Sequence, residues 1–100
     1  MLAQKDVAQF RFILRRALPF LGERYGVASL GLFGSYVRRE NRPDSDVDIL
    51  VTFTETPSLL RFIELENYLS DLLEVKVDLV MREALEPHIG QRILQEVVPV

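Results

Sequence analysis

Residues 45–51 read Ser-Asp-Val-Asp-Ile-Leu-Val, and this stretch decides the fold because carboxylates alternate in it with aliphatic side chains. Successive side chains of a β-strand point to opposite faces of the sheet, so Asp46 and Asp48 lie on one face, about 7 Å apart along the strand. The aliphatic residues between and after them then point into a hydrophobic core. Because the segment Val47–Phe53 is apolar on both faces apart from its acids, we expect it to be a central strand.

A third carboxylate, Asp78, lies inside another apolar run, Val75–Val80, which predicts a neighbouring strand. Carboxylates do not belong on buried strands unless something compensates their charge. Three acids that converge from two strands repel one another, and Mg²⁺ or Mn²⁺ removes that penalty because these hard cations take oxygen ligands. Asp46, Asp48 and Asp78 are therefore the predicted metal ligands and catalytic residues. Two such ions roughly 4 Å apart can hold both the attacking and the leaving oxygen of a displacement at phosphorus.

Gly34 and Ser35 follow the apolar run Val27–Phe33, itself a predicted strand, and begin a short predicted helix that reaches about Arg39. A glycine lets the backbone approach a phosphate closely, and free N–H groups at a helix N-terminus favour an anion. Each fragment also has a plain structural explanation: a Gly-Ser N-cap, a chance Asp-x-Asp, or an edge-strand charge at Asp78. The combination in this order is more specific, and it favours a metal and phosphate site.

The remaining segments predict helices that cover the sheet. Apolar residues recur at helical spacing from Val7 to Leu21, where Pro19 is expected to kink or restart the helix. A second helix opens near Ser58, and a last one spans Pro87–Val97. We expect the second helix to turn Glu64 and Glu66 outward and to bury Leu59, Phe62, Ile63, Leu65, Leu69, Leu72 and Leu73. This order of elements indicates an α/β or α+β fold, a small sheet covered by helices, in a single domain over residues 1–100.

Composition narrows the class of protein. With 48% hydrophobic and 27% charged residues, the chain is typical of a globular domain. No apolar run approaches the roughly 18 residues of a membrane span, and the N-terminus lacks a secretory signal, so a cytoplasmic location is expected. The absence of cysteine excludes disulfides and thiolate metal sites. A net charge of −3 argues against direct nucleic-acid binding, which favours a basic surface.

The sequence resembles the minimal nucleotidyltransferases of the DNA polymerase β-like superfamily in the order of its motifs. These are Gly-Ser, a short helix, Ser-Asp-x-Asp followed by aliphatic residues, and a later Asp between aliphatic residues. Gly34, Ser35, Asp46, Asp48 and Asp78 match this pattern position by position, and the order of elements extends the resemblance over nearly the whole chain. It implies a polymerase β palm-like fold with a small mixed sheet, and ATP as the nucleoside triphosphate donor.

The resemblance also implies roles for the matching residues. Asp46 and Asp48 would bind the metals that carry the triphosphate, and Asp78 would complete the shell of the catalytic metal and help deprotonate the acceptor hydroxyl. Gly34 and Ser35 would hold the β- and γ-phosphates, and pyrophosphate would leave.

The chain departs from the family pattern just after Gly-Ser. The family usually shows Ala-Arg-Gly there, whereas this chain reads Val37-Arg38-Arg39-Glu40. Arg38 matches the family's arginine and is expected to contact the nucleotide, and Arg39 replaces the glycine. If that turn requires a positive φ, a non-glycine residue costs about 1 kcal/mol.

Minimal members of this family are typically encoded beside a small helical HEPN-domain RNase toxin, which characterised members neutralise by transferring AMP to one of its tyrosines. The resemblance therefore implies a protein adenylyltransferase that serves as the antitoxin of a HEPN toxin. A short chain without an accessory domain also favours a folded macromolecule as acceptor. Two alternatives stay open: a non-catalytic antitoxin that masks its partner, and a transferase acting on RNA or a small molecule.

Two further features have open interpretations. The apolar C-terminal residues 97–100 contact either a partner or a second copy, which would make the protein a homo-oligomer, or else form a short edge strand. Tyr36, next to the Gly-Ser pair, either stacks on a base or packs in the core.

Overall fold

Strand β2 (Val47–Phe53), which carries Asp48, is an inner strand of a four-stranded sheet with the order β3-β2-β1-β4. The computed structural model describes residues 5–100. The other elements, in chain order, are α1 (Val7–Tyr25), β1 (Val27–Phe33), α2 (Ser35–Arg38), α3 (Leu59–Leu73), β3 (Val77–Met81), the 3₁₀ turn η1 (Arg82–Ala84), α4 (Pro87–Glu96) and β4 (Val98–Pro99).

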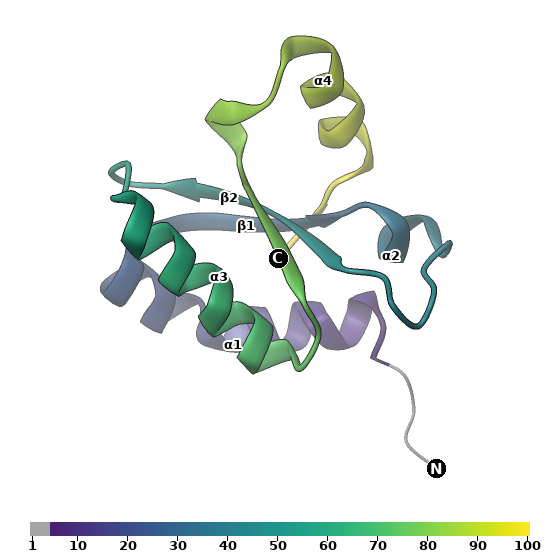
Figure 1. The fold of residues 1–100 in the computed structure, drawn as a ribbon, viewed down its shortest axis with the longest axis horizontal. Helices are drawn as coiled ribbons and strands as arrows, with labels where there is room; N and C mark the ends of the chain where they lie inside the picture. Colours follow the sequence, from purple (N-terminus) through teal and green to yellow (C-terminus); the bar gives the residue numbers. More distant parts are fainter. Residues whose placement is uncertain (1–4) are drawn as a thin grey trace.

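The sheet is mixed. Strand β1 pairs antiparallel with β2 and with β4, whereas β2 and β3 run parallel and are joined through α3. Helices α1 and α3 lie side by side under one face of the sheet, and α4 stands over the other face (Figure 1). The predicted small mixed sheet covered by helices is therefore confirmed, as is the inner position of β2.

The hydrophobic core lies between the sheet and the pair α1 and α3. Val47, Ile49 and Val51 of β2 point into it and are at most 1% exposed, as the alternation in the sequence predicts. Burial of such aliphatic side chains contributes roughly 1.5–3 kcal/mol each. The fully buried partners from the two helices are Phe10, Leu14, Leu21, Leu65, Leu69 and Leu73.

Helix α1 begins and ends with clear signals. Asp6 accepts a hydrogen bond from the backbone N–H of Gln9, whose side chain in return accepts one from the N–H of Asp6. The helix ends at Gly26, which adopts a left-handed conformation. The expected restart of the helix at Pro19 is wrong, since α1 is continuous from Val7 to Tyr25 with Pro19 inside it, whereas a kink at Pro19 stays a prediction. Pro19 and Arg15 are both exposed, so solvent can supply the hydrogen bond that the proline does not make.

The predicted core face of α3 is partly wrong. Leu59 and Ile63 are 73% and 43% exposed. At about 100° per residue, both fall outside the stripe through Leu65, Leu69 and Leu73, while Glu66 falls at its edge. Glu66 accordingly does not point outward: its carboxylate accepts a hydrogen bond from the N–H of Leu79 in β3, at 2.9 Å.

The chain's last residues form an edge strand. Val98 and Pro99 pair with β1, and the N–H of Val100 donates to the carbonyl of Leu30 at 3.0 Å. The edge-strand interpretation of residues 97–100 is therefore confirmed. Within the described range, no helix is both long and apolar enough to cross a membrane.

Candidate active site

The candidate site lies on the sheet face that looks away from α1 and α3. Asp48 and Asp78 are register partners on the parallel strands β2 and β3, so their side chains project from the same face. Asp46 immediately precedes β2, and its carboxylate lies 4.0 Å from the ammonium of Lys76. Within residues 5–100, no group of three or more His, Cys, Asp or Glu side chains is arranged to hold a metal ion as it stands.

Asp48 is half-buried and feels the negative charges of two other acids. Burial and the negative charges of Asp78 and Asp46 raise the pKa of Asp48 to about 6, and Arg38 opposes this shift only in part. A hydrogen bond between the carboxyl groups of Asp48 and Asp78 acts in the same direction. The site thus concentrates negative charge that the described residues do not neutralise.

Gly34 lies directly beneath the Asp48 carboxylate. Its φ of 84° belongs to the region that favours glycine, and a Cβ at this position would overlap the carboxylate of Asp48. The turn after β1 therefore accepts only glycine, for a backbone and a steric reason together. This contact joins the Gly-Ser turn to the acids, as the sequence predicts from their order alone.

The short helix α2 holds Ser35 and Arg38 beside this turn. The N–H groups of Val37 and Arg38 donate to the carbonyl of Gly34, both at 3.1 Å. Arg39 ends the helix with a φ of 59°. The position where the family has glycine therefore does require a positive φ, which costs Arg39 about 1 kcal/mol.

Glu96, at the end of α4, is a site residue that the sequence analysis does not identify. Its carboxylate accepts a hydrogen bond from the N–H of Gly34 at 2.7 Å and another from Nη1 of Arg38 at 2.8 Å. These contacts lower the pKa of Glu96 although burial acts in the opposite direction. No motif surrounds Glu96, and 62 positions separate it from Gly34, so no local signal marks it.

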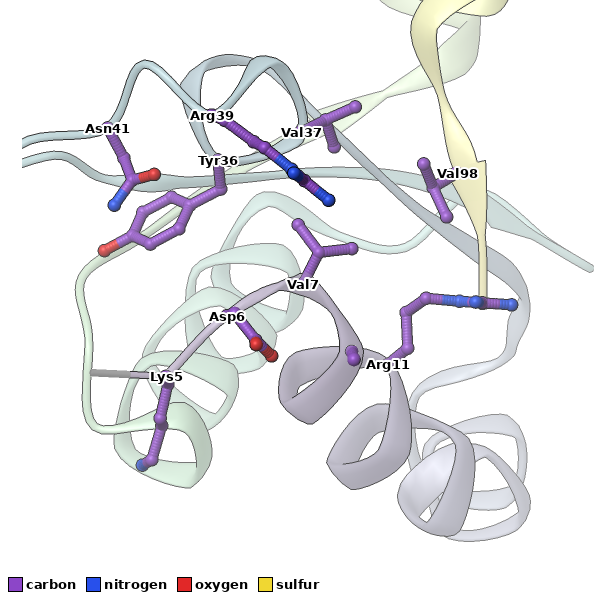
Figure 2. Close-up of a pocket in the computed structure, with 10 residues that line it drawn as sticks. Lys5, Asp6, Val7, Arg11, Tyr36, Val37, Arg39, Asn41 and Val98 are labelled. Atoms are coloured by element: carbon purple, nitrogen blue, oxygen red, sulfur yellow. The ribbon is translucent and has the colours of Figure 1, made fainter. Parts of the chain in front are cut away.

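A cavity of about 310 Å³ is lined by Gly34, Arg38, Asp48 and Glu96, but not by Asp46, Asp78 or Ser35. Its lining comes from β1 and β2, the Gly-Ser turn and α4: Phe33, Gly34, Arg38, Asp48, Ile89, Arg92, Ile93 and Glu96. A larger cavity of about 580 Å³ lies between the start of α1, α2 and β4, and Arg11, Tyr36 and Arg39 are among its walls (Figure 2). None of the three acids lines it. Tyr36 packs edge-to-face on Phe10 with ring centroids 5.2 Å apart, so the interpretation as a packed aromatic is confirmed.

The residues fit a divalent cation. Asp48 is held close to Asp78 at the cost of a raised pKa, and the available donors are carboxylate oxygens, which Mg²⁺ and Mn²⁺ prefer. A cation would remove the repulsion that the raised pKa reports.

Comparisons with known proteins agree with this geometry. Residues 14–100 match the family model described as nucleotidyltransferase domain. The protein adenylyltransferase MntA of Thermococcus cleftensis is 52% identical over 97 residues, which cover 97% of this chain and 98% of that protein.

Two solved structures share the fold. A structure assigned provisionally as a minimal nucleotidyltransferase superposes with a TM-score of 0.79 at 37% identity, over 98% of this chain and 99% of that one. The second is that of tri-AMPylated Shewanella oneidensis HEPN toxin in complex with MNT antitoxin. It matches with a TM-score of 0.66 at 22% identity, over 90% of this chain and 70% of that one.

Proposed function

Because the chain belongs to the nucleotidyltransferase domain family, we propose that it transfers AMP from ATP to a hydroxyl group of a partner protein. The observation that carries this proposal is the contact between the two halves of the site. The Asp48 carboxylate, in register with Asp78, lies against Gly34, and Asp48 and Gly34 line the same small cavity. A group of carboxylates alone is compatible with many kinds of metal site. Carboxylates beside a glycine turn can bind a polyphosphate together with its cation, because the turn offers backbone N–H groups to the phosphate.

Asp46, Asp48 and Asp78 would hold Mg²⁺ or Mn²⁺. When bound, the ion neutralises the carboxylates and the developing charge on the phosphate oxygens. The side chain of Asp46, just before β2, is 41% exposed and near Lys76, and it would turn toward the two other acids to share the ion.

The chain's own groups would position the nucleotide and move the proton. The N–H of Gly34, the hydroxyl of Ser35 and the guanidinium of Arg38 would hold the β- and γ-phosphates. The acceptor oxygen forms a bond to the α-phosphorus while the bond from that phosphorus to the bridging oxygen of the β-phosphate breaks. Pyrophosphate leaves, and the hydroxyl proton passes to the carboxylate of Asp78.

A HEPN toxin is the proposed partner, and a tyrosine of that toxin the proposed acceptor. Support comes from the name of the Thermococcus cleftensis relative and from the AMPylated toxin in the Shewanella oneidensis complex. In this proposal the protein is a single cytoplasmic domain that acts as the antitoxin. It binds the toxin protein and does not bind nucleic acid directly.

The test is the intact mass of a HEPN-domain partner incubated with this protein, ATP and Mg²⁺. An increase in mass by one or more adenylyl groups is expected with the wild type. Asp46→Asn/Asp48→Asn should give none, whereas Asp44→Asn, an exposed acid in the preceding turn, should behave as the wild type. A tight complex without a change in mass, formed equally by wild type and double variant, would contradict transfer and support neutralisation by masking.

A further inference from the structure

One carboxylate occupies two of the three donors that the proposed function assigns to phosphate. Glu96 accepts from the N–H of Gly34 through one oxygen and from Arg38 through the other. Its side chain is only 20% exposed, so the contact is partly shielded from solvent. A carboxylate and a phosphate oxygen compete for the same charge-assisted hydrogen bonds, and one N–H cannot serve both fully.

Helix α4 presents a whole face to this cavity. Ile89, Arg92, Ile93 and Glu96 are spaced i, i+3, i+4 and i+7, which places them on one side of a helix, and all four line the cavity with Asp48. A polyphosphate that entered would meet two negative side chains, Asp48 and Glu96. A cation at the acids would compensate Asp48, but the carboxylate of Glu96 would still repel the polyphosphate.

We propose that Glu96 is a latch on the nucleotide site: it holds α4 against the Gly-Ser turn when no nucleotide is bound, and the triphosphate must displace it. This inference rests on the proposed function and concerns the regulation of the same site. Since only molecules with the latch open can bind, the apparent dissociation constant equals the intrinsic one divided by the open fraction. Affinity for ATP is then set in part by Glu96, a residue that does not contact bound nucleotide.

The anchoring of α4 permits such a movement. Gly90 is its one fully buried residue, whereas α1 and α3 each bury several large side chains in the core. The helix is joined to its neighbours by the short segments around Leu85 and Val97, and Val97 packs on Gly31 of β1. Few buried apolar contacts are the property of segments that open locally at low cost.

Arg38 would stay in place when Glu96 leaves. Its Nε donates to the carboxylate of Glu40 at 2.8 Å, independently of the bond from Nη1 to Glu96. Release of the latch therefore frees one edge of an already oriented guanidinium, and this edge can then bind a phosphate. Arg92, one turn before Glu96, brings a second guanidinium to the same wall.

The test compares nucleotide binding by wild type, Glu96→Gln and Glu96→Ala. The probes are ATP with Mg²⁺ and inorganic tripolyphosphate, measured by titration calorimetry. Affinity for both should rise about 10-fold in Glu96→Ala and less in Glu96→Gln, which keeps a weak acceptor. Glu86→Gln removes the same charge from the exposed start of α4, away from the cavity, and should leave affinity unchanged.

A second measurement uses the wild type alone. In ¹H–¹⁵N spectra, tripolyphosphate should shift the amide of Gly34 together with those of residues 93–96, because the latch opens as the anion binds. Unchanged or weaker binding by folded Glu96 variants, or a shift of Gly34 with residues 93–96 unmoved, would overturn the latch while leaving the proposed function intact. If neither wild type nor variants bind ATP, both proposals fail.

Discussion

The two faces of strand β2 differ in the polarity of their side chains and in the elements that cover them. Residues 47, 49 and 51 face α1 and α3, are aliphatic and are at most 1% exposed. Asp48, Leu50 and Thr52 face the other way: the two polar residues are half-buried, Leu50 is 7% exposed, and Asp48 shares a cavity with α4, a helix with only one buried residue. One face of the strand therefore belongs to the hydrophobic core, and the other carries the Asp48 carboxylate of the candidate site.

A chain of 100 residues can accommodate a charged site because one strand serves both the core and the site. The site needs converging acids and a raised pKa at Asp48, which oppose folding. The opposite face supplies the compensating burial because alternation along a strand separates the two sets of side chains. Mutations on one face should therefore affect stability and those on the other should affect activity.

Gly34→Ala should break this separation and have the largest effect. The new Cβ would overlap the carboxylate of Asp48, and alanine is strained at a φ of 84°. Adenylyl transfer should fall at least roughly 100-fold, and the free energy of unfolding should fall by about 2 kcal/mol. Labelling of the partner with radioactive ATP and chemical denaturation measure the two effects. Gly22→Ala, in helix α1, should leave transfer nearly unchanged; it is a control for activity alone, because its Cβ would lie 3.3 Å from the backbone carbonyl oxygen of Val27.

Ile49→Ala should affect the core face alone. Ile49 is fully buried between β1 and the two helices, and its truncation should lower the free energy of unfolding by about 2–5 kcal/mol. Well below the unfolding temperature, activity per folded molecule should stay near the wild-type value. Thr52→Ala, on the opposite face of the same strand, should cost much less stability. An equal loss in both variants would show that the two faces are not distinct.

The free energy of unfolding should depend on pH because of Asp48, which lies on the face of β2 that looks away from α1 and α3. The pKa of Asp48 is raised to about 6, so the folded protein binds this proton more tightly than the unfolded chain. The favourable contribution of Asp48 to the free energy of unfolding is fully present below about pH 4 and is lost as pH rises through about 6. The loss amounts to roughly 1–2 kcal/mol after allowance for solvent screening. Without divalent ions, unfolding free energies of wild type and Asp48→Asn should diverge over this range, with the variant becoming the more stable. Parallel curves would contradict the assignment.

Arg39→Gly should produce the smallest change, a gain in stability. Arg39 has a φ of 59°, so glycine relieves about 1 kcal/mol of strain and loses part of this gain to the greater freedom of the unfolded chain. The expected rise in melting temperature is a few degrees. Arg39→Ala removes the same side chain but keeps the strained backbone, so it should not share the gain.

The sequence predicts the strands better than the helix faces. Val27–Phe33 and Val47–Phe53 are strands with those bounds, because a buried strand with a period of two leaves little choice of register. The face of α3 is less certain because Leu59 and Ile63 are as apolar as the residues that are buried. Only the position of the neighbouring helix and sheet decides which leucines are covered.

The sequence predicts the positions of those site residues that belong to a local motif. Gly34, Asp48 and Asp78 lie where strand alternation and the Gly-Ser turn place them. Glu96 is not predicted because its role depends on where α4 docks, and nothing in residues 87–96 encodes that contact locally. The metal ligation by Asp46, Asp48 and Asp78 and the phosphate contacts of Ser35 and Arg38 stay predictions.

If Asp48 and its neighbouring acids serve chemistry at the expense of stability, Asp48→Asn should separate the two properties most clearly. Melting temperature without divalent ions and adenylyl transfer to a HEPN-domain partner should be measured on the same sample at pH 7.5. The two quantities should change in opposite directions: transfer falls at least roughly 100-fold while the melting temperature rises by several degrees. Retained transfer, or a melting temperature that falls with the activity, would contradict this expectation.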